Sequence, residues 1–142
     1  MPAKRTTPNR FQRTRRDHAN ETAEDYVEAV ADLISRKGVC RITELAKLFK
    51  VSHVTVTKII ARLKREGLVS SVPYGPIALL EPGARLAQQA RRRHAIVHGF
   101  LKAIGVGDKA AEIDAEGIEH HVSEETLRRL EALTTRLRSE QA

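Results

Sequence analysis

The chain has 142 residues, enough for one compact core and a small second module but not for a catalytic domain beside a DNA-binding domain. Its formal net charge of +7 indicates a polyanionic partner, nucleic acid first and an anionic membrane second. No apolar run approaches the length of a membrane span, the N-terminus lacks the apolar segment of a secretory signal, and Cys40 is the single cysteine. We therefore expect a cytoplasmic protein without an intramolecular disulfide.

The first predicted helix follows a polar segment. Residues 1–20 are basic and contain two prolines, so we expect them to form a disordered arm. A helical pattern begins at Thr22, and Gly38 is a natural end for it. Its apolar residues recur every three or four positions: Tyr26, Val27, Val30, Leu33 and Ile34.

Two more helices and a hairpin follow. Apolar spacing predicts a short helix over 42–49, and Ser52 can cap a third helix over 53–66. The period then changes to short β-rich pieces over 68–72 and 77–80, separated by a Pro/Gly turn. Helix, turn, helix and hairpin is the plan of a winged helix-turn-helix.

In that plan the N-terminal residues of the recognition helix meet base edges in the major groove. Thr methyl groups and Val56 can then meet thymine methyl groups. The candidates for reading bases are Ser52, His53, Thr55, Val56 and Lys58. The candidates for phosphate contacts are Thr57, Lys58, Arg62 and Lys64, with Tyr74 in the wing turn reaching the flanking backbone. These cations can also simply solvate a helix face, but the helix spacing, the wing and the net charge together favour binding to double-stranded DNA.

The rest of the chain is helical in pattern. Pro82 suits the first turn of a long helix, Asp108 can cap a short one, and Ser123 can start a last amphipathic helix. The apolar residues of the last helix are Leu127, Leu130, Leu133 and Leu137. We predict a mainly α protein, with a winged helix-turn-helix domain over 21–81 and an all-helical domain over 82–142.

The segment Glu116-Gly117-Ile118-Glu119-His120 carries the strongest chemical signal. On a helix, positions i, i+3 and i+4 share one face, which would present two carboxylates and an imidazole together. Carboxylates so close repel and raise each other's pKa, and a divalent metal is the simplest compensation. Taken alone, the segment also fits a solvated acidic face with an incidental histidine.

Other candidate ligands lie far away in the sequence. Asp25 and Glu28 stand at positions i and i+3 of the first predicted helix and share a face. Asp25 also fits the end of a capping box that begins at Thr22, and Glu28 alone would be an ordinary surface acid. His94 lies in the long helix, where a lone histidine is more often packed or on the surface than a ligand.

These residues carry a family resemblance. The segments concerned are Glu24-Asp25-Tyr26-Val27-Glu28, residues 51–58, Arg93-His94 and, most specifically, residues 114–123. Over about residues 22–138 the chain resembles the diphtheria toxin repressor family of metal-dependent regulators, and within it the manganese transport regulators. The resemblance implies a transcriptional regulator rather than an enzyme, with a metal-binding and dimerisation domain after the wing.

The resemblance also implies a ligand set. Carried over by position, the ligands are Asp25, Glu28, His94, Glu116, Glu119 and His120. In the iron-sensing branch the positions of Asp25 and Glu116 typically hold Met and Cys, whereas carboxylates suit Mn²⁺ better; Fe²⁺ stays the alternative because its ligand preference overlaps. Four carboxylates and two neutral imidazoles carry four negative charges, which two divalent ions per subunit would cancel, with Glu28 or Glu119 bridging them.

Two histidines depart from the shared pattern. His98 stands where relatives often have an acid, and we expect it on the surface or supporting a ligand. His121 is one step around the helix from His120 and should face away. The basic arm before residue 20 is also outside the resemblance.

A metal held by both sets of ligands would join the DNA-reading module to the helices beyond the wing. A homodimer paired through the apolar final helices would then place two recognition helices on a palindromic operator. The implied role is repression of manganese uptake genes when Mn²⁺ is plentiful, with activation of export genes as an alternative. The other readings are an iron(II)-responsive repressor, a winged-helix regulator that uses no metal, a metallohydrolase, and a nucleoid protein that binds DNA by charge alone. We expect neither a membrane partner nor a small organic substrate.

Overall fold

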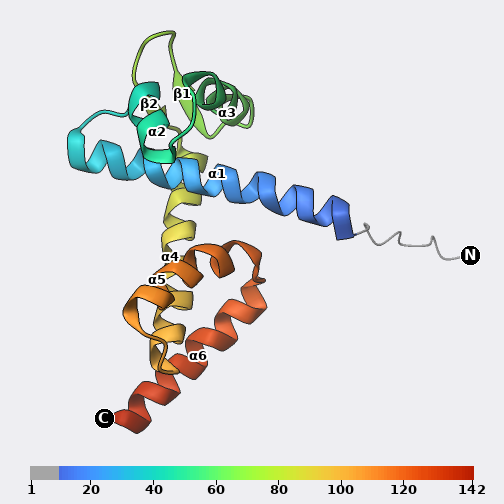
Figure 1. Cartoon of the computed structure of the whole chain (residues 1–142), viewed down its shortest axis with the longest axis vertical. Helices are drawn as coiled ribbons and strands as arrows, with labels where there is room; N and C mark the ends of the chain where they lie inside the picture. Colours follow the sequence, from blue (N-terminus) through green and yellow to red (C-terminus); the bar gives the residue numbers. More distant parts are fainter. Residues whose placement is uncertain (1–9) are drawn as a thin grey trace, which may run out of the picture.

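The computed structural model describes residues 10–142. Its elements are α1 (Arg10–Lys37), α2 (Ile42–Phe49), α3 (His53–Arg65), β1 (Val69–Ser71), β2 (Ile77–Leu79), α4 (Glu81–Ala103), α5 (Asp108–Ile118), the 3₁₀ helix η1 (Glu119–His121) and α6 (Glu124–Gln141). Figure 1 shows α2, α3 and the hairpin gathered on one side of the long helix α1, and α4 leading away from them to α5 and α6. The predicted mainly α fold with an N-terminal winged helix-turn-helix is confirmed.

The start of α1 differs from the expectation. The helix begins at Arg10 rather than Thr22, so the second half of the expected disordered arm (residues 1–20) is helical, and residues 1–9 lie outside the described part. No Gly or Pro interrupts residues 10–22, and the packed turns from Ala23 onward supply the nucleus from which a helix extends. Thr22 therefore lies inside the helix, where its Oγ1 donates to the carbonyl of His18 at 3.0 Å, and the capping-box interpretation of Asp25 was wrong.

Local signals set the other boundaries of the DNA-reading module. Gly38 and Gly67 adopt φ of 78° and 75° and end α1 and α3, as their positions in the sequence predicted. The Ser52 Oγ accepts from the backbone N of Thr55 at 3.1 Å and caps α3. The predicted stripes of α1 and α3 meet in one core, which includes Tyr26, Val27, Val30, Leu33, Leu45, Val56, Ile60 and Leu63.

The wing is a two-stranded antiparallel hairpin tied to the segment that precedes α2. Val69 pairs with Leu79, and the register places Ser71 opposite Ile77. The Ile77 backbone N donates to the carbonyl of Cys40 at 2.8 Å, and the Arg41 guanidinium donates to the carbonyl of Tyr74 at 3.2 Å. Cys40 is wholly buried, as expected.

Helix α4 joins two cores. Its first half packs against α1 and the hairpin, where a Cβ on Gly83 would lie 2.0 Å from the carbonyl oxygen of Leu68. Its second half packs against α5 and α6 around a smaller core of Ile96, Val97, Ala115 and Leu127. Ser123 caps α6 as predicted, accepting from the Thr126 backbone N at 3.2 Å. Among the described residues no helix is both long and apolar enough to cross a membrane.

The segment expected to be one metal-binding helix is divided. The N-cap of α5 is Gly107 rather than Asp108, and the α-helix ends at Ile118. Glu119 and His120 lie in η1, so the three acidic and histidine positions do not form a single α-helical stripe. A 3₁₀ helix has about three residues per turn instead of 3.6, which changes the direction of the last side chains.

Candidate metal centre

The six expected metal ligands come from four elements. Asp25 and Glu28 come from α1, His94 from α4, Glu116 from α5, and Glu119 and His120 from η1. Helix α4 packs against both α1 and α5, and η1 contacts both α1 and α4. The junction between the DNA-reading module and the later helices is therefore where these side chains meet.

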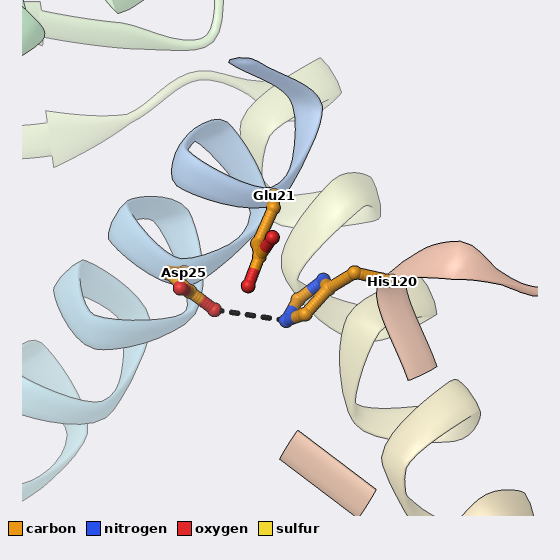
Figure 2. Close-up of side chains that lie close together, drawn as sticks. All are labelled: Glu21, Asp25 and His120. Carbon is orange, nitrogen blue, oxygen red and sulfur yellow. Dashed lines mark ion pairs between the residues drawn. The ribbon is translucent and has the colours of Figure 1, made fainter. Parts of the chain in front are cut away.

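His120 lies at the centre of the junction and is 1% exposed at its side chain. Its Nε2 lies 3.1 Å from Asp25 Oδ1 and 3.3 Å from Glu119 Oε1. Figure 2 shows the imidazole directed at Asp25 across the space between η1 and α1, with Glu21 beside it. On the other side of the ring, Nδ1 donates to Glu24 Oε2 at 2.6 Å.

His94 extends the cluster from α4. Its Nδ1 lies 3.0 Å from Glu119 Oε2 and 3.4 Å from Glu116 Oε1. Glu119 thus lies between the two histidines. Glu28 interacts electrostatically with the same residues. Burial and the charge of Glu116 raise the pKa of Glu28, and His94 opposes that rise.

The structure therefore brings five of the six expected residues into direct contact, with the Glu28 carboxyl group feeling the charges of Glu116 and His94. Residue patterns alone did not find three of their neighbours. Donor atoms of Glu21, Asp25 and His120 lie within 4.8 Å of one another, and so do those of His94, Glu112 and Glu116. Glu21 and Glu112 each stand four residues before an expected ligand, a helical spacing that could have found them. Glu24 had no such signal, because its partner His120 is ninety-six positions away.

The two departing histidines also contact acids. His98 Nε2 lies 3.4 Å from Glu112 Oε2, and its ring stacks on that of His94 with centroids 5.8 Å apart. His121 Nε2 lies 3.2 Å from Glu21 Oε2, and its side chain is partly exposed. Both therefore flank the cluster rather than lie at its centre.

The electrostatics of the junction call for added positive charge. Burial is the main cause that raises the pKa of Glu119 to about 7; His94 opposes it, and the charge of Glu116 adds to it. Burial would lower the pKa of His120, but its interactions with Asp25 and Glu24 outweigh burial and raise the pKa to about 10. A carboxylate and an imidazole in this setting each hold a proton in the absence of another cation.

The donor set fits a divalent metal. Among the described buried side-chain atoms, His94 Nδ1, Glu119 Oε2 and His120 Nε2 have neighbours close by but no hydrogen-bond partner. Buried polar atoms are normally satisfied, and these three offer lone pairs to a metal once the protons described above have left. Imidazole nitrogens mixed with carboxylate oxygens suit Mn²⁺, Fe²⁺ or Zn²⁺.

The DNA-reading face needs one correction. Of the residues expected to contact DNA, Ser52, His53, Thr55, Thr57, Lys58, Lys64 and Tyr74 are exposed. Val56 is 0% exposed within the core, so it cannot meet thymine methyl groups; Val54, two residues earlier in the helix, is exposed instead.

Two of the three cations expected to contact phosphate are engaged within the chain. Arg62 Nη2 donates to the carbonyl of Ala19 at 2.9 Å, and Lys64 Nζ donates to the carbonyl of Ser71 at 2.7 Å. Lys58 is exposed and makes no such contact with the described residues, so it is the one of these three cations that stays available for DNA.

Two family models match the chain in the order of its modules. One, described as the iron dependent repressor N-terminal DNA binding domain, matches residues 18–77; the other, the iron dependent repressor metal binding and dimerisation domain, matches residues 81–140. The chain belongs to the iron-dependent repressor family. It is therefore a DNA-binding transcriptional regulator with a metal-binding and dimerisation domain, and the resemblance found in its sequence is confirmed.

Individual members of the family are similar over most of the chain. A protein described as transcriptional regulator MntR of Escherichia coli O6:H1 is 44% identical over 117 residues, 82% of this chain and 76% of that protein. HTH-type transcriptional regulator MntR of Lysinibacillus sphaericus is 33% identical over 107 residues, 75% of this chain and 77% of that protein.

Solved structures agree on the fold. A manganese-dependent transcriptional repressor in complex with manganese gives a TM-score of 0.71 at 28% identity, over 80% of this chain and 52% of that one. The manganese regulator SloR gives 0.70 at 25% identity, over 80% of this chain and 53% of that one. The chain thus spans about half the length of these two solved chains.

Proposed function

We propose that the chain is a manganese-responsive repressor that binds the operators of manganese uptake genes as a homodimer when Mn²⁺ is bound. The observation that carries the proposal is the 3.1 Å approach of Asp25 Oδ1, from the helix that begins the DNA-reading module, to Nε2 of His120 in the metal-binding domain. A metal held there contacts both modules at once. Binding of the metal therefore changes the orientation of the recognition helices relative to the metal-binding domain.

The ligands proposed for this role are Asp25, Glu28, His94, Glu116, Glu119 and His120. Their four carboxylates favour Mn²⁺ over softer metals, and their combined charge balances two divalent ions per subunit. Relatives named as manganese regulators support this choice of metal. Glu119 lies between both histidines and is the better placed of the two bridging candidates.

The proposed switch is electrostatic. Without a cation, the buried Glu119 and its acidic neighbours repel one another across the junction, and protons relieve that repulsion only partly. A bound metal removes the repulsion and joins α1 to η1. A dimer then holds its two recognition helices at the separation of the half-sites of a palindromic operator.

The test is a titration of operator binding followed by fluorescence anisotropy. Mn²⁺, Fe²⁺ under anaerobic conditions, and Zn²⁺ are added to the full chain with a fluorescent duplex from the upstream region of a manganese uptake gene. We expect Mn²⁺ to tighten binding and a chelator to reverse it, with a scrambled duplex as the control. Operator binding that ignores both metal and chelator would reject the proposal.

A matched pair of variants tests the ligand role. Asp25→Asn should remove the response to Mn²⁺, because a neutral amide is a poor replacement for a carboxylate ligand. Asp32→Asn should keep the response, since Asp32 lies on the same helix but pairs with Arg36 on the surface.

An iron(II)-responsive repressor is the second candidate. The family models that match the chain are described as iron dependent, and the same donors accept Fe²⁺. A response to Fe²⁺ at lower concentration than to Mn²⁺ would favour this candidate.

A further inference from the structure

Two consecutive residues of α1 approach the two nitrogens of one imidazole. Glu24 Oε2 lies 2.6 Å from Nδ1 of His120, and Asp25 Oδ1 lies 3.1 Å from its Nε2. Side chains of neighbouring residues in an α-helix point about 100° apart. Glu24 and Asp25 can therefore contact opposite nitrogens of the same ring. Among the described residues, the contact with Glu24 is the one hydrogen bond to the His120 side chain.

Glu24 is placed as a buried partner rather than as a surface acid. Its side chain is 12% exposed and that of His120 is 1% exposed. A buried carboxylate is costly unless it is paired, and a charge-assisted bond of this length supplies the pairing.

The chemistry of imidazole gives this contact a consequence. A neutral imidazole has one protonated nitrogen and one free lone pair, so a carboxylate that accepts from Nδ1–H leaves the lone pair on Nε2. That nitrogen is the one that faces Asp25 and Glu119. Carboxylates that accept from the second nitrogen of a metal-binding histidine fix the ring and strengthen its donor atom.

We propose that Glu24 is a positioning residue for the metal centre: it binds no ion itself but holds His120 with Nδ1 protonated and Nε2 directed at the donors of Asp25 and Glu119. This inference rests on the proposed function, which makes Nε2 of His120 a ligand of the regulatory metal. In this arrangement helix α1 makes two separate contacts with His120. Asp25 shares the metal with Nε2, and Glu24 accepts a hydrogen bond from Nδ1.

The first test measures Mn²⁺ binding to the full chain by calorimetry without DNA. We compare the parent with Glu24→Ala, Glu24→Gln and the surface control Asp32→Ala. Glu24→Ala should weaken Mn²⁺ binding by about 10–100-fold, the usual effect of removing such a support. Glu24→Gln should recover at least half of that loss on a logarithmic scale, because its side-chain carbonyl still accepts from Nδ1–H. Asp32→Ala should match the parent.

The second test reads the ring itself. Histidine labelled with ¹⁵N is observed by NMR in the chain loaded with Zn²⁺, which is diamagnetic. The parent should show His120 with a proton on Nδ1 and metal on Nε2, and Glu24→Gln should keep that pattern. A general loss of folding would not move the proton between the two nitrogens.

The outcomes separate the two proposals. A parent that binds Mn²⁺ together with a Glu24→Ala variant that binds it equally well overturns the positioning role and leaves the proposed function intact. Glu24→Gln no better than Glu24→Ala, or metal found on Nδ1 in the parent, also overturns the positioning role. A parent that does not bind Mn²⁺ at all overturns the proposed function and this inference with it.

Discussion

Glu119 has a buried carboxyl group in the middle of an acidic junction. Its side chain is 1% exposed and lies between His94 and His120, with Oε2 3.0 Å from Nδ1 of the former and Oε1 3.3 Å from Nε2 of the latter. Such a group is stable only with a proton or a cation beside it. The carboxylate best placed to bind a metal therefore also destabilises the folded chain when no metal is bound.

This arrangement predicts how the metal-free chain responds to pH. The folded pKa of Glu119 is about 7 against an ordinary 4.5, and that of His120 is about 10 against 6.5. In both cases the folded state binds more protons than the unfolded state over the interval between the two values, so the free energy of unfolding falls as pH rises through it. The Glu119 contribution is lost between about pH 4.5 and 7, and the His120 contribution between about 6.5 and 10.

We expect the melting temperature of the chelator-treated protein to fall steadily from pH 5.5 to 8.5. The Glu119→Gln variant cannot ionise at this position and should show a flatter profile below pH 7. Circular dichroism melts at a series of pH values measure both. A melting temperature that rises over this range would contradict the electrostatics described for the junction.

At the scale of elements, the start of α4 lies close to the backbone that leads into the wing, because Gly83 has no side chain to keep the two apart. Gly83 is buried in the first turn of α4, and a Cβ there would meet the carbonyl oxygen of Leu68 at 2.0 Å. Because that neighbour is backbone, it cannot move aside without shifting the strand or the helix.

Gly83→Ala should therefore destabilise the chain by about 1–3 kcal/mol or more, although Ala favours helix elsewhere. Chemical denaturation measures the change. Ala84→Ser at the exposed neighbouring position should change stability by less than about 0.5 kcal/mol. Equal stabilities for the two variants would mean that the close approach of α4 to the wing is not maintained in solution.

Helix α3 makes a second prediction. Lys58 is exposed on the reading helix, whereas Arg62 and Lys64 are engaged with Ala19 and Ser71. Lys58→Ala should weaken binding to operator and nonspecific duplexes alike and reduce the slope of log K against log salt by about 1. Anisotropy titrations at several salt concentrations measure the slope.

The control for this variant is Lys109→Ala, which removes a charge from exposed α5 and should leave the slope unchanged. A Lys58→Ala slope equal to that of the parent would mean that this side chain does not contact a phosphate.

Elements whose ends depend on neighbouring residues could be predicted from the sequence. The helix over 42–49 and the caps Ser52 and Ser123 are confirmed, since a cap needs only a hydroxyl and the next turn. The start of α1 and the change to 3₁₀ geometry at Glu119 were missed. These depend on helix propagation into a polar segment and on packing of η1 against α1 and α4, which no local spacing encodes.

At the scale of the whole molecule, α4 contributes residues to both hydrophobic cores. Ala87 closes the core of the DNA-reading module, and Ile96 begins the core of the metal-binding domain. The stretch of α4 between them begins with the exposed Gln88 and Gln89. We expect the proposed metal to act on the reading helices partly through the stiffness of this stretch of α4.

Gln89→Gly should soften that stretch, at a local cost of about 1 kcal/mol relative to Ala, and reduce the factor by which Mn²⁺ tightens operator binding. Affinity for Mn²⁺ itself should change little, because no expected ligand is altered. Gln89→Ala is the matched control and should keep the full factor. An unchanged factor in Gln89→Gly would assign the coupling to the junction side chains alone.

The candidate site could be predicted only where the sequence carried a known pattern. The six expected ligands were named from the resemblance, and the structure places them at one junction. Glu24 was assigned no role from the sequence, because its partner His120 is distant in sequence. Val56 was assigned to DNA because its position in the reading helix was counted without its burial, which the packing of α2 and α1 decides.

Two hydrogen bonds tie the wing to the residues before α2. Ile77 and Tyr74 are each joined to that segment, through Cys40 and Arg41 respectively. Strands this short would fray if they stood alone. Solvent deuterium should therefore enter the Ile77 amide slowly, because that amide donates to the Cys40 carbonyl. With both its turn and its second strand tied to the residues before α2, the wing should approach a DNA backbone as one unit with the reading helix.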